Sequence, residues 1–90
     1  MARQVSICTN VIDGDTFDIT GSIRIRLARV NGPPLNTPGG QKTKTLLESL
    51  ILDKVITYEV LATDVYGRIV AEVWVDDTNV NDAVISAGDK

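Results

Sequence analysis

Apolar and polar residues alternate along three stretches in the first third of the chain and along two more in its second half. Alternation of this kind is typical of β-strands that bury one face and expose the other. In the third stretch, Ile23, Ile25 and Leu27 share the inward face, whereas Arg24 and Arg26 share the outward face. The pattern predicts strands at residues 4–11, 17–20, 23–30, 55–61 and 68–75.

The alternation has two further features. In the first predicted strand, Val5 and Ile7 share one face. In the third, Ala28 shares the outward face, and Arg29 falls where an inward residue is due. A β-bulge would explain the break at Arg29, because one extra residue reverses the facing of those that follow.

Two other segments have the spacing of helices. The longer one is predicted at residues 41–52, where four apolar residues form one stripe: Leu46, Leu47, Leu50 and Ile51. A shorter helix is predicted to end at Ala87, with Asn79 or Asn81 as its N-cap and Gly88 as its stop. Residues 31–40 contain three prolines and three glycines and are predicted to form a loop.

The order of these elements is strand, strand, strand, helix, strand, strand, short helix. This order predicts a mainly β fold with α-helices (α+β), namely a five-stranded OB-fold barrel. One helix then lies between strands three and four, and a short helix lies at the C-terminal end. We expect residues 1–90 to form a single domain of this kind. An open α+β sandwich is the alternative, because local alternation does not separate the two.

Composition removes several classes of chemistry. Cys8 is the single cysteine, which excludes an internal disulfide and metal sites built on cysteine pairs. The chain has no histidine, which excludes Ser-His and Cys-His nucleophiles and imidazole zinc ligands. No apolar run is long enough to span a membrane, and the N-terminus lacks a secretory hydrophobic region. We therefore expect a cytoplasmic protein without membrane contact.

The charges are unevenly distributed along the chain. The net charge is −3 and the isoelectric point is near 4.7, which disfavours broad non-specific binding of nucleic acid. Basic residues nevertheless exceed acidic ones in residues 1–45, whereas acidic residues dominate residues 46–90. The positive charge is therefore concentrated in the half that holds the candidate site.

The candidate site lies in residues 11–35. The turn Asp13-Gly14-Asp15 joins two predicted strands, and Arg24 and Arg26 follow on one face of the next strand. Carboxylates that hold a cation, beside guanidinium groups that bind phosphate, are what phosphodiester chemistry requires. The alternative interpretation is structural, with Asp13 as a plain turn residue and Arg26 paired with Asp15 in an ion pair of modest strength.

Several motifs in this order resemble the staphylococcal nuclease family. The resemblance spans Val11 to Gly88 and depends on the motifs Val11-Ile-Asp-Gly-Asp-Thr16, Arg26-Leu-Ala28, Gly39-Gly40, Asp64-Val-Tyr-Gly-Arg68 and Asn79-Val-Asn81. It implies an OB-fold and a calcium-dependent endonuclease that cleaves single-stranded DNA and RNA. Calcium (Ca²⁺) is therefore the expected cofactor, and single-stranded DNA or RNA the expected partner.

The resemblance also implies roles for individual residues. Asp15 corresponds to a carboxylate that ligates the metal, and Asn31 and the backbone of Gly32 correspond to further ligands in the loop. Arg26 and Arg68 correspond to the catalytic arginines that contact the scissile phosphate. Thr16 and Tyr66 complete the expected site as substrate-binding residues: Thr16 follows the metal-binding turn, and the ring of Tyr66 is suited to base stacking.

Two substitutions separate this chain from the family pattern. The family reads approximately Val-Asp-x-Pro-Glu-Leu after the third strand, whereas this chain has Asn31 for the aspartate and Pro34 for the glutamate. Loss of a general base typically reduces the rate ~10²–10⁴-fold. Asp64, Asp13 and Glu48 are the alternative carboxylates, with Asp64 nearest in the expected fold.

Whether the chain is an enzyme is therefore left open by its sequence. The expected function is a nuclease-like domain with impaired or absent activity. The alternatives are an OB-fold module that binds single-stranded nucleic acid and a protein-interaction domain without catalysis, with a protein partner or a homodimer.

Overall fold

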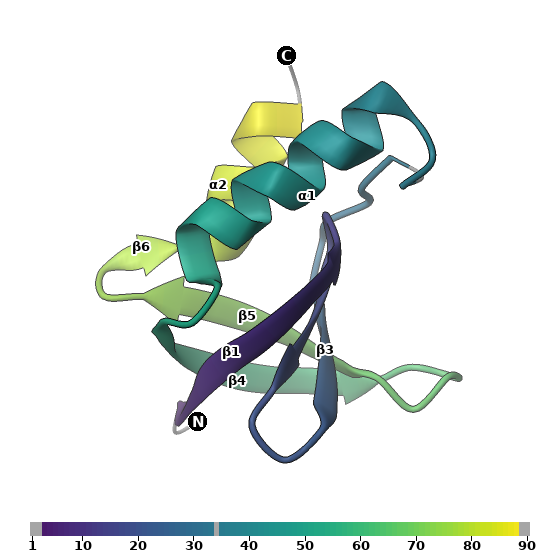
Figure 1. Ribbon diagram of the computed structural model, residues 1–90. Coiled ribbons are helices and arrows are strands. Elements are labelled where there is room, and N and C mark those ends of the chain that lie inside the picture. The colour runs from purple at the N-terminus through teal and green to yellow at the C-terminus, as the bar shows by residue number, and fades with distance from the viewer. Residues whose placement is uncertain (1–2, 34, 89–90) are drawn as a thin grey trace.

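The polypeptide winds into a closed β-barrel with two helices packed together over one end (Figure 1). The computed structural model describes residues 3–33 and 35–88. Its strands are β1 (Gln4–Asp13), β2 (Thr16–Ile19), β3 (Ile23–Leu27), β4 (Val55–Thr63), β5 (Ile69–Val75) and β6 (Thr78–Asn79). Its helices are α1 (Pro38–Ile51) and α2 (Val80–Gly88). Within the described ranges, neither helix is long and apolar enough to traverse a bilayer.

Parallel pairing of β3 with β5 closes the barrel. The other neighbours, β3–β2, β2–β1, β1–β4 and β4–β5, are antiparallel. At the parallel seam, Ile25 pairs with Ile69 and Leu27 pairs with Ala71. This seam confirms the OB-fold-like α+β barrel over the open sandwich, because an open sheet would leave β3 as an edge strand without a partner on its outer side.

The register places the alternating residues as their spacing predicts. Val11, Phe17 and Ile25 are cross-strand partners and all three are buried, whereas Thr16 and Arg26 pair on the other face of the same strands. The core inside the barrel and beneath the helices consists of Cys8, Val11, Phe17, Ile19, Ile25, Leu27, Val30, Leu47, Ile51, Ile56, Tyr58, Ala71, Val73, Val80 and Val84. Burial raises the pKa of the Cys8 thiol to about 11.

Helix α1 begins three residues before its predicted start. The Thr37 hydroxyl caps it by accepting the Gly40 N–H at 3.1 Å, and Pro38 occupies the first turn. Proline is well tolerated there because the N–H that it lacks would have no partner within the helix. The helix buries Leu47 and Ile51, which confirms part of the predicted stripe.

The third strand is shorter than its alternation predicts, and the bulge expected at Arg29 is absent from the β2–β3 register. The strand ends at Leu27, and Arg29 lies in a turn with φ +67°. Ala28 is buried rather than outward, because its N–H donates to the carbonyl of Ala71 at 2.9 Å. Ile23, expected inward, is 39% exposed at the open end of the strand.

Two carboxylates hold the side chain of Arg29 outside the barrel. Its guanidinium donates to Glu72 at 2.9 and 2.7 Å and to Asp82 at 3.0 Å. A non-glycine residue in the left-handed region is strained, typically by 1–3 kcal/mol. These three hydrogen bonds offset that strain and attach the loop after β3 to β5 and α2.

This ion pair gives stability a defined pH dependence. Hydrogen bonds from Arg29 lower the pKa of Glu72 below its ordinary value near 4.5, against a smaller opposing effect of burial. Because the folded pKa is the lower one, the pair stabilises above about pH 4.5 and loses its contribution as the pH falls through the folded pKa. We expect Glu72→Gln to lower the free energy of unfolding by about 1 kcal/mol near neutral pH. Urea denaturation should show this loss shrinking in acid, and an equal loss at both pH values would contradict it.

The end of the chain contains one strand that the sequence pattern does not predict. The turn expected at residues 76–78 contains only residues 76 and 77. Thr78 and Asn79 form β6, which pairs with β5. The Asn79 side chain accepts the Asp82 N–H at 2.8 Å, which confirms Asn79 as the cap of α2. Asn81 has a different role, because it is fully buried in the helix against the barrel.

Candidate functional site

The turn that carries Asp13 and Asp15 packs directly against α1. A Cβ added to Gly14 would collide with the side chain of Thr43 in that helix, so only glycine fits. Asp13 accepts the backbone N–H of Asp15 at 3.0 Å, which stabilises the turn. The carboxylate of Asp15 is thereby held in a fixed position beside the loop after β3.

Both carboxylate oxygens of Asp15 have hydrogen-bond donors. The Thr16 hydroxyl donates to Oδ1 at 2.8 Å, and the Gly32 backbone N–H donates to Oδ2 at 3.4 Å. A guanidinium nitrogen of Arg26 lies 3.7 Å from Oδ2, and both side chains are largely buried. Three residues that the resemblance assigns to the site therefore converge on Asp15.

The loop after β3 fixes the orientation of Arg26. Its guanidinium donates to the carbonyls of Leu27 and Val30 at 3.2 and 2.9 Å. It also donates to the side-chain oxygen of Asn31 at 3.2 Å. The guanidinium is therefore preorganised, because these hydrogen bonds already hold its side chain in one conformation before an anion binds.

The two aspartates of the turn titrate as a pair with opposite shifts. Burial, together with the hydrogen bond to Asp15, raises the pKa of Asp13. Burial also acts to raise the pKa of Asp15, but hydrogen bonds from Asp13 and Thr16 and the charge of Arg26 outweigh it, so that this pKa is lowered. Asp15 is consequently the stable anion of the pair, and Asp13 is protonated first.

The arrangement of these oxygens does not fit a resident calcium ion. Calcium takes six to eight oxygen ligands, several of them anionic. Among residues 3–33 and 35–88, no three Asp, Glu, His or Cys side chains gather in a way that could hold a metal. The Asn31 oxygen faces Arg26, and Gly32 presents its N–H rather than its carbonyl to Asp15. The positive charge beside Asp15 is therefore the guanidinium of Arg26.

Arg68 lies at the end of the β4–β5 hairpin, where Asp64 organises the turn. The Asp64 carboxylate accepts the N–H groups of Tyr66 and Arg68 at 3.0 and 2.9 Å and the Arg68 Nε–H at 2.6 Å. Desolvation acts to raise the pKa of Asp64, but these hydrogen bonds outweigh it and lower the pKa. Because the carboxylate oxygens of Asp64 already accept these hydrogen bonds and its pKa is lowered, Asp64 is poorly suited to replace the missing general base.

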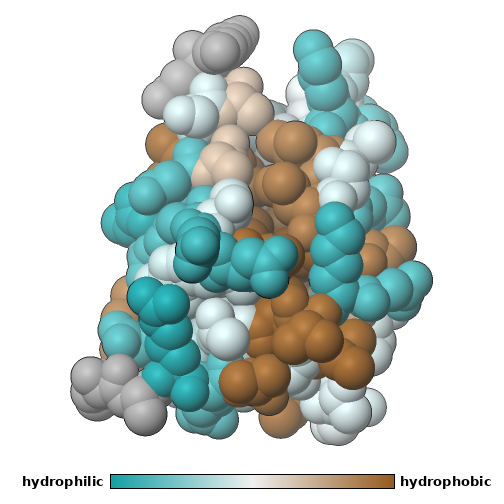
Figure 2. Space-filling view, turned by 90° about the vertical axis from the view of Figure 1, so that its left-hand side faces the viewer, coloured by the Kyte–Doolittle hydropathy of each residue, from teal (hydrophilic) through white to brown (hydrophobic). Residues whose placement is uncertain are grey.

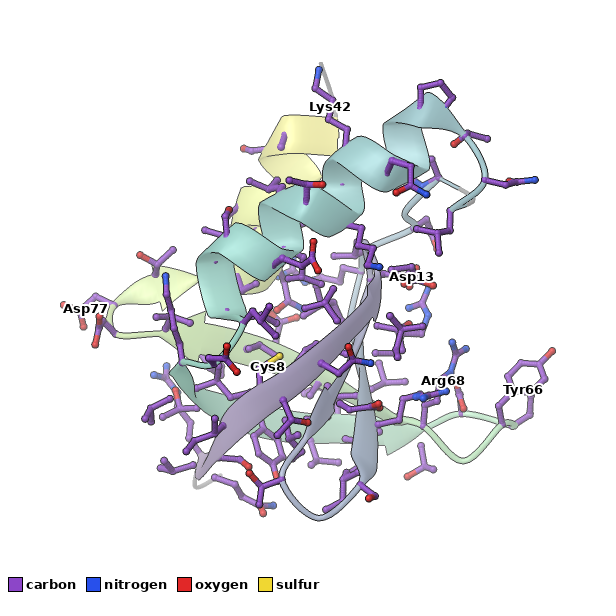
Figure 3. The ribbon with its side chains drawn as sticks, viewed as in Figure 1. Cys8, Asp13, Lys42, Tyr66, Arg68 and Asp77 are labelled. Carbon is purple, nitrogen blue, oxygen red and sulfur yellow. The ribbon has the colours of Figure 1, made fainter. Side chains whose placement is uncertain are left out.

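The parallel seam brings this hairpin to the same outer face as Arg26. Arg26 pairs with Val70, so Arg68 lies one strand across and two residues earlier along the seam. Figure 3 shows Asp13 and the pair Arg68 and Tyr66 on the same side of the barrel. The Tyr66 ring is 81% exposed, and its centroid is 5.3 Å from the guanidinium carbon of Arg68.

The structure thus divides the expected site into two adjacent parts. One cluster contains Asp15, Thr16, Arg26, Asn31 and Gly32, and Arg68 and Tyr66 form the neighbouring hairpin. Pro34, where the family glutamate is expected, lies outside the described residues.

Sequence reasoning missed the partners that hold this site in place. They are the carbonyls of Leu27 and Val30, which hold Arg26, and the Thr43 contact, which holds the turn. Backbone carbonyls leave no signal in a sequence. The glycine between the two aspartates is the one sign of the Thr43 contact.

Comparison with known proteins finds similar sequences over most of the chain. An uncharacterized endonuclease of Escherichia coli is 34% identical over 82 residues, which cover 87% of this chain and 54% of that protein. An uncharacterized endonuclease of Haemophilus influenzae is 29% identical over 93 residues, covering 97% of this chain and 52% of that protein. Protein ParB of Escherichia coli is 28% identical over 90 residues, covering 87% of this chain and 51% of that protein. The chain spans about half the length of these relatives.

A family model gives the broader assignment. The model described as staphylococcal nuclease homologue matches residues 24–89, which include both arginines of the site and the seam between β3 and β5. This match confirms the resemblance found in the sequence motifs. The chain therefore belongs to the staphylococcal nuclease homologue family.

Proposed function

We propose that this nuclease-family domain binds the phosphodiester backbone of single-stranded DNA or RNA and hydrolyses it slowly or not at all. The observation that carries the proposal is the fixed guanidinium of Arg26, held by two backbone carbonyls beside Asp15. A planar guanidinium with fixed donors suits the tetrahedral oxygens of a phosphate.

Arg68 supplies a second guanidinium to the same face. Asp64 binds its Nε, and in the described part of the chain its two terminal nitrogens have no hydrogen-bond acceptor. Asp64 therefore orients the side chain and leaves its outer edge for a ligand. Two guanidinium groups on adjacent strands can contact the same phosphodiester from two sides.

Weak hydrolysis follows from the carboxylates available. Asp64 is engaged in its turn, and Asp13 shares a hydrogen bond with Asp15. Glu48 lies on α1, outside the cluster around Asp15. Without a base to activate water, a loss of ~10²–10⁴-fold in rate is expected relative to a complete site.

We further propose that binding does not require calcium. The guanidinium of Arg26 already supplies the positive charge beside Asp15, so a phosphate can bind without a bridging metal ion. The same titration in calcium and in a chelator tests this point. Equal affinities support the proposal, and binding that appears only with calcium contradicts it.

Arg26→Gln tests the proposed function directly. One charge-assisted hydrogen bond contributes about 1.5 kcal/mol at an accessible site, so the affinity for a fluorescein-labelled oligothymidylate should fall about tenfold. Fluorescence anisotropy measures the affinity, and a denaturing gel measures cleavage. Arg68→Gln is the second variant, because Arg26 also bonds to its own loop.

Arg3→Gln is the matched control. It makes the same change of charge where the guanidinium of Arg3 covers the ring of Trp74, 3.6 Å from the ring centroid. Figure 1 shows the start of β1 on the opposite side of the barrel from the β4–β5 hairpin. Affinities of the Arg26 and Arg68 variants that match the control would overturn the proposed function.

A protein-interaction domain is the second candidate. Val5, Ile7 and Val55 are 68%, 45% and 59% exposed, and Ile7 is the cross-strand partner of Val55 on the outer face of β1 and β4. Figure 2, which views the molecule from the side where β1 begins, shows a band of hydrophobic surface between hydrophilic flanks. A domain of this class would show no oligonucleotide affinity that falls with rising salt or with Arg26→Gln.

A further inference from the structure

A groove of about 900 Å³ lies on the outer face of the barrel, between the β2–β3 hairpin and the β4–β5 hairpin. Its lining includes residues 20–22, Arg24, Tyr66 and Arg68. Asp15, Arg26 and Asn31 are not among its lining residues. The groove is therefore separate from the cluster around Asp15, although Arg68 borders it. Its volume is within the range of small-ligand pockets, roughly 300–1,000 Å³, which is room for a nucleotide.

Arg24 is the residue that connects the groove to the candidate site. It precedes Arg26 by two residues on β3, so both side chains lie on the same outer face. Two residues along a strand span roughly 6.6 Å, a separation comparable to that of neighbouring phosphates in an extended single strand. The parallel register pairs Ile25 with Ile69, and Arg24 and Arg68 directly precede these two residues. The three arginines thus form a short row of cations across β3 and β5.

An aspartate holds one edge of Arg24, as Asp64 does for Arg68. Asp18 accepts the Nε–H of Arg24 at 2.9 Å and a terminal N–H at 3.3 Å. The other terminal nitrogen has no acceptor among the described residues, and the side chain is 50% exposed. The ion pair therefore fixes the guanidinium and leaves one edge free for an anion.

Tyr66 gives the groove a surface for a base. Tyr66 is 81% exposed, and its ring centroid lies 5.3 Å from the guanidinium carbon of Arg68. Stacking on an aromatic ring requires a base that is not paired in a duplex. The groove therefore combines phosphate contacts on one wall with a stacking surface on another, which is the chemistry of a single strand.

We propose that this groove is a second subsite, in which Arg24 binds a phosphate next to the one at Arg26 and Arg68, and Tyr66 stacks on the adjoining base. The inference extends the proposed function and rests on it. Thr20 and Ser22, which carry hydroxyl groups suited to a sugar or phosphate, line the same groove. The ligand is an extended single strand longer than the dinucleotide that the first site alone accommodates.

The length of the oligonucleotide provides the test. The logarithm of the association constant for octathymidylate should fall with the logarithm of the salt concentration. Arg24→Gln should make this slope shallower by about 0.7, because one phosphate contact with a single strand is lost. For a thymidine dinucleotide, which fills only the first site, Arg24→Gln should leave the affinity unchanged. Tyr66→Ala should weaken octathymidylate binding about tenfold through the lost stacking. Arg3→Gln is again the control, and thermal melting verifies that each variant is folded.

The results separate this inference from the proposed function. If wild-type protein binds no octathymidylate, the proposed function fails. If it binds through Arg26 but Arg24→Gln gives the same slope as Arg3→Gln, the second subsite alone is overturned. Amide chemical shifts of the wild-type protein are an independent check, because octathymidylate should perturb Gly21 and Ser22 and the dinucleotide should not. Should Arg24→Gln fail to fold, absence of those shifts overturns the subsite by itself.

Discussion

Asn81→Leu is expected to lower the free energy of unfolding by about 3 kcal/mol or more. Asn81 is fully buried in α2. Its side-chain oxygen accepts the Val73 N–H at 2.9 Å, and its amide donates to the carbonyls of Ala28 and Ala71 at 2.9 and 3.0 Å. Leucine fills a similar volume but leaves the Val73 N–H and the Ala28 carbonyl without that partner, each at a cost of about 1–3 kcal/mol.

Urea denaturation measures this effect, and the neighbouring Asn79 provides the control. Asn79→Ala removes the cap of α2 and the hydrogen bond that the Asn79 amide donates to Glu72 at 3.2 Å, and it should cost about 1–2 kcal/mol. A loss of 3 kcal/mol is a large part of the stability of a small domain, so Asn81→Leu is expected to be partly unfolded at 37 °C. If both variants lose the same stability, the buried hydrogen bonds of Asn81 are not what joins α2 to β5.

Asn31→Asp is expected to raise calcium affinity about 30-fold. A unit charge about 4 Å from a divalent ion contributes about 2 kcal/mol even at the dielectric constant of water, which corresponds to this factor. The new carboxylate would join Asp15 as a second anionic ligand and would compete for the guanidinium of Arg26. Isothermal titration calorimetry measures the change in calcium affinity.

Asn36→Asp is the control for Asn31→Asp. It adds the same charge to the same loop at an exposed position. Adding Pro34→Glu to Asn31→Asp restores the second family carboxylate, and the double variant should cleave single-stranded DNA faster than the wild type. If Asn31→Asp and Asn36→Asp have equal calcium affinities, position 31 does not face the position of the metal in the family.

Local sequence patterns predicted the fold well where one face of a strand is buried. The alternation of β3 correctly gave Ile25 and Leu27 as inward residues, whereas Ile23 is exposed. It failed at Arg29, because a turn held by contacts with Glu72 and Asp82 replaces the end of the strand. It also left the shared face of Val5 and Ile7 unassigned, and that face proves to be the outer one.

The candidate site was predictable only in its parts. The motifs selected Asp15, Arg26 and Arg68 as candidates, and the structure places Arg26 beside Asp15 and Arg68 on the neighbouring hairpin. The direction of the Asn31 oxygen toward Arg26 could not be predicted, because it depends on how the whole loop folds. The pairing of Arg24 with Asp18 was equally hidden, since it needs the β2–β3 register.

The seam between β3 and β5 has a consequence for the order in which the domain assembles. Arg26 and Arg68 are separated in the chain by all of α1 and β4, and only the parallel pairing brings them together. Contacts between distant segments cost the most loop entropy and tend to form late in folding. During synthesis on a ribosome, β3 cannot pair with β5 until β5 has emerged. The nascent chain therefore forms its first strands and α1 before Arg26 and Arg68 share one face.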